Sequence, residues 1–242
     1  MEFVSREHFD TYLKGIQYLG QGCQGVCYLN TRNNTVYKVF NDYFDEEDAG
    51  YTKDFLLRFS DIKNSTFIWP NAVIIVAGTI VGYTMPYVKA KNLCDINPLQ
   101  VNLDKLEEAT IRAEKDIKLL TDSNVKLYDV RYNILYNNGK MYVIDTLDYN
   151  NSKTTYIENR RPVDDELMLF LVDNYFDYFV ENDKLLNAMY REYGVRGVDF
   201  LKVFRSKLSE YAGKDITKLS EVKHLVRKNK DHIYQRGVYY DK

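Results

Sequence analysis

The chain has 242 residues, which suits one large domain or two small ones. Its formal net charge of −2 excludes a global basic field that would favour nucleic acid or anionic membranes. Its three cysteines lack metal-ligand spacing and its three histidines are scattered, which fits a reducing compartment without structural zinc. No run approaches the ~18 apolar residues that span a bilayer, and residues 1–7 lack the features of a signal peptide. We therefore expect a cytoplasmic protein with neither a nucleic-acid nor a membrane partner.

A glycine-rich segment is the first feature that indicates a chemistry. Gly20, Gly22 and Gly25 have G-x-G-x-x-G spacing, which also occurs in dinucleotide-binding folds. Those folds need a helix directly after the loop, but residues 26–29 are β-prone and lead into a polar turn. The segment therefore predicts a strand–turn–strand hairpin.

A lone lysine lies on the next predicted strand, residues 35–40. Strand alternation places Val36, Lys38 and Phe40 on one face. A base can then lie on Val36 while its phosphates reach Lys38, which would make this pair of strands a nucleotide phosphate clamp. The alternative is an ordinary glycine-containing hairpin with one exposed lysine.

The chain divides into a strand-rich part, up to about residue 88, and a helix-rich remainder, which predicts an α+β, two-lobed molecule. In the first part we expect one helix, over 46–63, and strands over 72–76 and 79–85. In the second part the periodicity predicts helices over 103–121, 163–180, 184–193, 198–211 and 219–232.

A second informative segment lies between these helices. Asn137-Asn138-Gly139 is a tight-turn signal between two β-prone runs, so Asp129, Asn133 and Asp145 should gather at one end of a small hairpin. Phosphoryl transfer needs a carboxylate that orients the attacking hydroxyl and oxygen ligands for Mg²⁺. Asp129 suits the first task, Asn133 and Asp145 suit the second, and Arg131 can neutralise the transferring group. Alternatively, Asp129 and Asn133 only cap a strand.

With both segments in this order, the chain resembles the protein kinase superfamily over roughly residues 17–148. The resemblance rests on four motifs: the glycine loop followed by Tyr37-Lys38, a hinge between lobes at Met85-Pro86-Tyr87-Val88, a catalytic loop at Asp129-Val130-Arg131-Tyr132-Asn133-Ile134-Leu135, and Ile144-Asp145-Thr146-Leu147 at the metal-binding motif. It implies a small antiparallel β-rich N-lobe with one helix, residues 1–88, and a mostly helical C-lobe, residues 89–242.

The resemblance also implies roles for single residues, with ATP and Mg²⁺ as cofactors. Lys38 would bind the α- and β-phosphates, Asp129 would be the catalytic aspartate, and Asn133 and Asp145 would hold magnesium. The adenine would lie among residues of both lobes, gripped at its edge by the Pro86 carbonyl and the Val88 amide. The side chains on its two faces would be Leu19, Cys27 and Val36 on one and Leu135 on the other.

Several departures from the family pattern matter. Leu127-Tyr128 replaces His-Arg before the catalytic aspartate, Thr146-Leu147 replaces Phe-Gly, and no Ala-Pro-Glu follows. The interval from Asp129 to Asn133 is one residue shorter than usual. The acidic partner of the lysine is not evident, and Glu47 is the best candidate. Asp165 would be a buried anchor under the catalytic loop or, as the simpler interpretation, a helix N-cap.

Three functions fit these residues. The first is a kinase that phosphorylates a serine or threonine hydroxyl on a protein. The second is the same chemistry on a small hydroxylated molecule, which the short segment after Asp145 favours. The third is a pseudokinase that binds ATP without turnover, which the altered catalytic-loop spacing favours; retention of Lys38, Asp129, Asn133 and Asp145 weighs against it.

Overall fold

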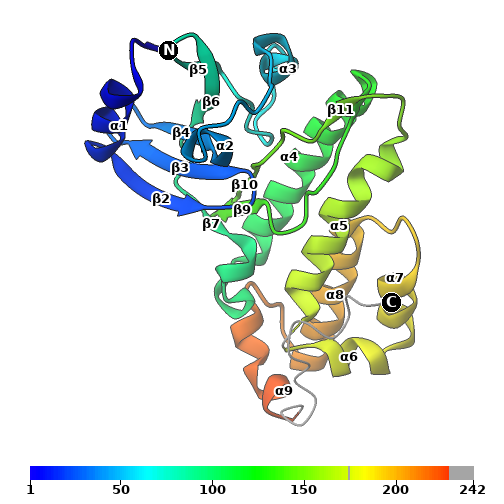
Figure 1. The fold of residues 1–242 in the computed structure, drawn as a ribbon. Coiled ribbons are helices and arrows are strands. Elements are labelled where there is room, and N and C mark those ends of the chain that lie inside the picture. The colour runs from blue at the N-terminus through cyan, green and yellow to red at the C-terminus, as the bar shows by residue number, and fades with distance from the viewer. Residues whose placement is uncertain (174, 229–242) are drawn as a thin grey trace. The chain divides into compact units, whose positions relative to one another are not determined.

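The chain forms an α+β protein with a mixed six-stranded sheet and helices in the computed structural model, which describes residues 1–173 and 175–228 (Figure 1). It separates into two compact units. The first unit comprises Met1–Lys63 and Ile68–Lys89, and the second comprises Asn64–Phe67 and Ala90–Lys242.

The first unit is built on the six-stranded sheet, in the order β1-β5-β6-β4-β3-β2. Its strands are β1 (Glu2–Phe3), β2 (Gln17–Gln21), β3 (Gly25–Asn30), β4 (Thr35–Phe40), β5 (Ala72–Val76) and β6 (Thr79–Pro86). The prediction of an antiparallel sheet was wrong at one edge, because β1 runs parallel to β5. The start of the chain hydrogen-bonds to this edge: the N–H of Ile75 donates to the Met1 carbonyl and that of Ala77 to the Phe3 carbonyl, both at 2.9 Å.

The first unit contains three helices instead of the one predicted: α1 (Arg6–Lys14), α2 (Asn41–Phe44) and α3 (Lys53–Leu57). The expected helix over 46–63 was too long, because Glu46 and Gly50 have positive φ and a helix cannot pass through them. Thr52 then starts α3, its side chain accepting the N–H of Phe55.

Helix α1 was not predicted, although its signals are local. Ser5 caps it by accepting the N–H of His8, and Phe9 and Leu13 bury the same face one turn apart. These two side chains pack with Tyr37 and Val39 of β4 in the hydrophobic core of the unit. That core therefore covers one face of β4, and Val36 and Lys38 point to the opposite face.

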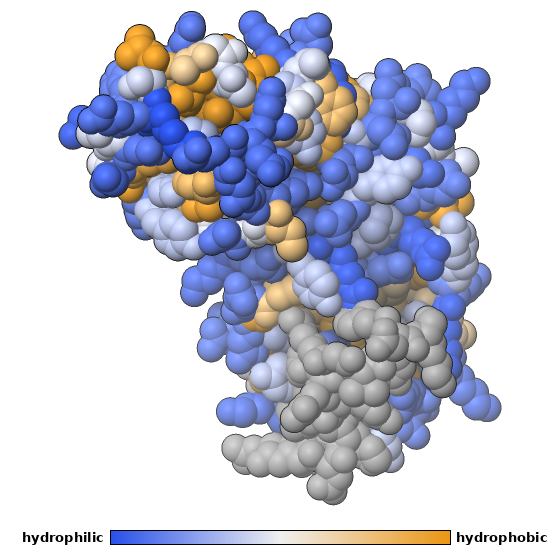
Figure 2. All heavy atoms as spheres, in the orientation of Figure 1, coloured by the Kyte–Doolittle hydropathy of each residue, from blue (hydrophilic) through white to orange (hydrophobic). Residues whose placement is uncertain are grey.

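Hydrophobic residues also reach the surface in places. Figure 2 shows them in small groups among hydrophilic residues over the first unit. Scattered exposure of this kind is normal for a folded protein.

The second unit is mostly helical, as expected. Its α-helices are α4 (Leu103–Asp122), α5 (Tyr156–Val172), α6 (Asp177–Asn182), α7 (Lys184–Arg191), α8 (Gly197–Ala212) and α9 (Lys223–Lys228), and its 3₁₀ helices are η1 (Leu93–Asp95), η2 (Pro98–Gln100) and η3 (Leu219–Val222). Helices α4, α5 and α8 lie side by side and pack on one another (Figure 1). The predicted apolar stripe of α4 is confirmed, because its five members are buried: Leu106, Ala109, Ala113, Ile117 and Leu120.

Two of the helices predicted in the second unit differ from the structure by more than two residues. The helix expected over 163–180 is divided into α5, which ends at Val172, and α6. Helix α5 begins before residue 163, because Thr155 and Glu158 form a capping box at its start. The expected helix over 219–232 is divided into η3 and α9, and residues 229–232 lie outside the described part of the chain.

Short strands complete the second unit: β7 (Lys91–Asn92), β8 (Val125–Lys126), β9 (Ile134–Asn137), β10 (Lys140–Val143) and β11 (Asn150–Asn151). They form two small sheets, β10-β9-β7 and β11-β8. The predicted hairpin is β9–β10. Its turn residues Asn138 and Gly139 have φ of 35° and 90°, the two positive values that a type I′ turn requires.

Candidate functional site

The glycine loop connects β2 to β3 and consists of residues 22–24. The structure explains only Gly25 by packing: a Cβ there would lie 2.2 Å from the Val39 carbonyl oxygen on the neighbouring strand. At Gly20 and Gly22 a Cβ would meet nothing within 4 Å, and neither residue has a positive φ. No atom of residues 1–173 and 175–228 therefore requires glycine at those two positions.

Lys38 lies in the middle of the sheet, where its strand neighbours are Cys27 on β3 and Tyr83 on β6. The side chain is buried, and Nζ donates to Oε1 of Gln24 in the glycine loop at 2.9 Å. Gln24 is thus a polar partner of the lysine that sequence analysis missed. Glu47, the expected acidic partner, is exposed, and its own N–H donates to the Asp42 carbonyl.

Three residues expected around the adenine can be placed on the sheet. Cys27 and Val36 lie on the same face as Lys38, as alternation predicts, whereas Leu19 lies at a β-bulge and is exposed. Val36 also pairs directly with Leu29 and Met85, which share its face. Leu29 was not singled out from the sequence, and Met85 was named only as part of the hinge.

The expected hinge begins at the end of β6. Asn71 donates its N–H to the Thr84 carbonyl, so the Pro86 carbonyl, two residues further on, points to the same edge of β6. Pro70, which precedes Asn71 in the segment beside β6, has no N–H that could donate to the Pro86 carbonyl. The Tyr87 N–H donates to Asn34 on the opposite side, and Val88 is half-buried.

In the second unit, the β9–β10 hairpin brings three predicted residues together. Asn133 immediately precedes β9, and Asp145 follows β10. The N–H of Ile144 donates to the Asn133 carbonyl at 3.0 Å, so the hydrogen bonds between the two strands continue to the end of the hairpin that lies away from its turn. The Asn133 side chain donates through Nδ2 to the Asp129 carbonyl at 2.7 Å. This bond orients the amide so that Oδ1 remains as its acceptor atom. Leu135 lies within β9 and is half-buried.

The backbone around these residues is unusual. Asp129, Tyr132 and Asp145 all have φ in the left-handed region, at 44°, 64° and 57°. Such conformations are costly for a bulky residue such as tyrosine, and they gather at functional sites. The Tyr132 carbonyl accepts a hydrogen bond from the Asn92 side chain, and the Arg131 guanidinium lies over the Tyr132 ring.

The two carboxylates also share an electrostatic neighbour. Burial raises the pKa of the Tyr149 hydroxyl, and the negative charges of Asp145 and Asp129 raise it further. Both carboxylates therefore act on one buried hydroxyl, which sequence analysis did not identify.

A buried anchor for the segment before Asp129 is present, but it is not Asp165. Asn159 on α5 accepts the Leu127 N–H at 3.0 Å and donates to the Val125 carbonyl at 2.7 Å. Asp165 is half-exposed beside Arg161, and it does not cap α5, whose N-cap is Thr155. Both interpretations of Asp165 were wrong: α5 begins at Tyr156, so Asp165 lies inside the helix, and its side chain is half-exposed.

The donor set at the hairpin end suits Mg²⁺. Asn133 offers an amide oxygen and Asp145 a carboxylate, and Mg²⁺ takes its remaining ligands from phosphates and water. Within residues 1–173 and 175–228, no group of three or more His, Cys, Asp and Glu side chains is arranged to hold a metal without such help.

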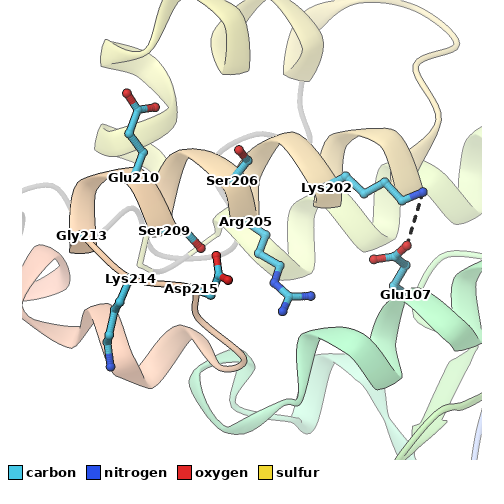
Figure 3. A pocket seen from close by; sticks show the side chains of 9 residues that line it. All are labelled: Glu107, Lys202, Arg205, Ser206, Ser209, Glu210, Gly213, Lys214 and Asp215. Atoms are coloured by element: carbon cyan, nitrogen blue, oxygen red, sulfur yellow. Dashed lines mark ion pairs between the residues drawn. The ribbon is translucent and has the colours of Figure 1, made fainter.

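A cavity of about 820 Å³ lies elsewhere in the second unit, beside α8 (Figure 3). Its three basic groups are paired within the protein: Lys202 with Glu107, Arg205 with Asp104, and Lys214 with Glu221. The predicted site residues are not among those that line it.

Comparison with protein-family models and with curated proteins gives no match. In the described part of the chain, no helix combines the length and apolarity needed to cross a membrane.

Proposed function

We propose that this chain is an ATP- and Mg²⁺-dependent phosphotransferase of the protein kinase type, acting on a serine or threonine hydroxyl of a protein. The first unit would correspond to the N-lobe of such an enzyme and the second to the C-lobe. The observation that carries the proposal is the convergence of Asp129, Asn133 and Asp145 at one end of the β9–β10 hairpin.

Each polar residue then has one task. Lys38, whose ammonium group is held by Gln24, would bind the α- and β-phosphates. Asp129 would accept a hydrogen bond from the acceptor hydroxyl and orient its oxygen toward the γ-phosphorus. Asn133 and Asp145 would hold Mg²⁺, which supplies positive charge to the phosphates when it is bound. Arg131 would stabilise the charge on the transferring group.

The side chains of the first unit provide a place for the base. Cys27 and Val36 lie on the Lys38 face of the sheet and would contact the adenine, with Leu19 at its margin. The Pro86 carbonyl would accept from the adenine amino group, and the Val88 N–H would donate to a ring nitrogen. Leu135 would contact the opposite face of the ring.

One observation favours a small hydroxylated molecule as the acceptor. The segment between Asp145 and α5 is short and held in place: Asn150–Asn151 pairs with β8, and the Ser152 N–H donates to the Asn124 carbonyl at 2.9 Å. A segment tied down in this way offers little backbone on which to seat a peptide.

Nucleotide binding is the first test. Mg·ATP should raise the melting temperature of the protein, and a concentration about 100-fold above Kd should add about 2.7 kcal/mol of stability. Asp145→Asn should remove the magnesium-dependent part of the rise in melting temperature. Asp122 is an exposed aspartate of the same unit, and Asp122→Asn should leave that part unchanged. No shift with any nucleotide would exclude all three functions considered above.

Transfer is the second test. With labelled ATP, a generic protein acceptor and a panel of small hydroxylated metabolites separate the two acceptor classes. Asp129→Ala should stop transfer to either acceptor and leave ATP binding in place. ATP binding without transfer in the unmodified protein would identify a pseudokinase.

A further inference from the structure

One residue, through its side chain and its backbone, contacts all three residues of the glycine loop. Asn41, the first residue of α2, donates through Nδ2 to the carbonyls of Gly22 at 3.3 Å and Cys23 at 2.8 Å. Its backbone N–H donates to the carbonyl of Gln24 at 3.2 Å. Three consecutive loop carbonyls are therefore directed toward a single residue.

Because the peptide bond is planar, the direction of these carbonyls also fixes the direction of the adjacent N–H groups. In a trans peptide, the N–H of each residue points away from the carbonyl of the residue before it. With the Gly22 and Cys23 carbonyls directed at Asn41, the N–H groups of Cys23 and Gln24 project to the other side of the loop. Successive N–H groups on one side of a turn form a concavity that binds anions.

The same loop also carries the cation. The Gln24 side chain accepts from Lys38 Nζ at 2.9 Å, so the lysine is held next to this turn. A Cβ added at Gly20 or Gly22 would meet no atom of the described residues within 4 Å. Within the first unit, backbone donors, an ammonium group and open space thus occur together.

We propose that Asn41 is a positioning residue that holds the glycine loop with its N–H groups directed at the phosphates of a bound nucleoside triphosphate. This inference rests on the proposed function, and it adds a residue that the sequence motif does not contain. Asn41 acts on the loop carbonyls and does not itself touch the nucleotide.

The expected effect is selective for phosphate. Asn41→Ala should weaken Mg·ATP binding roughly tenfold, measured by calorimetry, because the loop donors lose their orientation. Binding of adenosine, which has no phosphates, should change less than twofold. Asn41→Gln, which keeps the amide donor on a longer side chain, should recover part of the loss. Gln17→Ala, an exposed change on β2 of the same hairpin, should leave both ligands unaffected.

Hydrogen exchange provides a readout that does not depend on the nucleotide. The Gly22 amide, whose N–H donates to the Gly25 carbonyl at 2.9 Å, should exchange faster in Asn41→Ala than in the unmodified protein, with α4 unchanged as evidence of an intact fold. Equal losses for ATP and adenosine, or unchanged exchange in the loop, would overturn the inference. Binding of neither ligand by the unmodified protein would overturn the proposed function, and with it the phosphate role of Asn41. Faster loop exchange in that case would still show that Asn41 orders the turn.

Discussion

A glycine is needed where an atom of the protein occupies the space of a side chain, or where a bound ligand occupies that space. Gly25 is of the first kind, since the Val39 carbonyl of the adjacent strand occupies the space of a Cβ. Gly20 and Gly22 have open space and ordinary backbone angles. The motif therefore combines one glycine that packing requires with two that packing among the described residues does not require.

We expect the two kinds of glycine to respond oppositely to alanine. Gly25→Ala should lower the free energy of unfolding by about 2 kcal/mol or more, because a backbone atom blocks the new Cβ. Gly22→Ala should change it by less than about 1 kcal/mol but weaken ATP binding roughly tenfold. Denaturant unfolding and calorimetry measure the two effects. A Gly22→Ala variant with unaltered ATP affinity would remove the functional argument for that glycine.

At the scale of elements, α5 supports the segment that leads to Asp129. Asn159, in the first turn of α5, hydrogen-bonds to the backbone of Val125 and Leu127. Its Nδ2 also donates to the Thr121 hydroxyl at the end of α4. One buried amide therefore connects two helices and a strand.

Asn159→Ala should destabilise the protein by about 2–4 kcal/mol, because it leaves buried backbone groups without a partner. In the proposed enzyme it should also lower the transfer rate, since the Asp129 loop begins directly after Leu127. Chemical denaturation and initial rates provide the measurements, with the exposed Asn151→Ala as the control. Transfer that is unaffected at a temperature where the variant is folded would show that the anchor serves stability alone.

The contact between α5 and α8 should make stability depend on pH. Asp164 is buried on α5 and accepts the Gly197 N–H at 2.9 Å, and Arg160 lies 3.1 Å from its other oxygen. Burial nevertheless dominates and raises the pKa of Asp164 to about 7. The folded state then binds a proton more tightly than the unfolded state does, so this contribution is complete below about pH 4 and is lost as pH rises toward 7.

The check is the unfolding free energy measured at several pH values. It should fall between about pH 4 and pH 7, and Asp164→Asn should flatten this dependence. Asp165→Asn, at the half-exposed neighbouring position, should preserve most of it. A slope of the opposite sign would mean that Arg160 outweighs burial.

At the scale of the whole molecule, the groups assigned to one reaction come from two compact units. Lys38 and the glycine loop belong to the first, and Asp129, Asn133 and Asp145 belong to the second. If they act in a single phosphoryl transfer, their contributions cannot be independent.

Lys38→Met and Asp145→Asn should each reduce transfer by roughly 100-fold or more. The double variant should lose little beyond the larger single effect, because residues that act as a unit are not additive. The test compares the transfer rates of the unmodified protein, the two single variants and the double variant, and melting temperatures confirm that each is folded. Losses that multiply would indicate that the two residues serve separate steps.

The sequence by itself determined the features that depend on neighbours along the chain. The β3–β4 hairpin, the Asn138-Gly139 turn and the buried stripe of α4 follow from period and turn chemistry over a few residues. For the same reason, the proximity of Asn133 and Asp145 was predictable, since one tight turn brings them to the same end; Asp129 is joined to them by the Asn133 side chain.

Only the tertiary structure decided which residues support these groups. Gln24 beside Lys38, Asn41 under the glycine loop, Asn159 in place of Asp165 and the parallel strand β1 all involve contacts with other elements or across a loop. An amide side chain such as Asn41 or Asn159 has the same local preferences in a loop as at an anchor. Its partners are chosen by packing between distant segments, which no local pattern records.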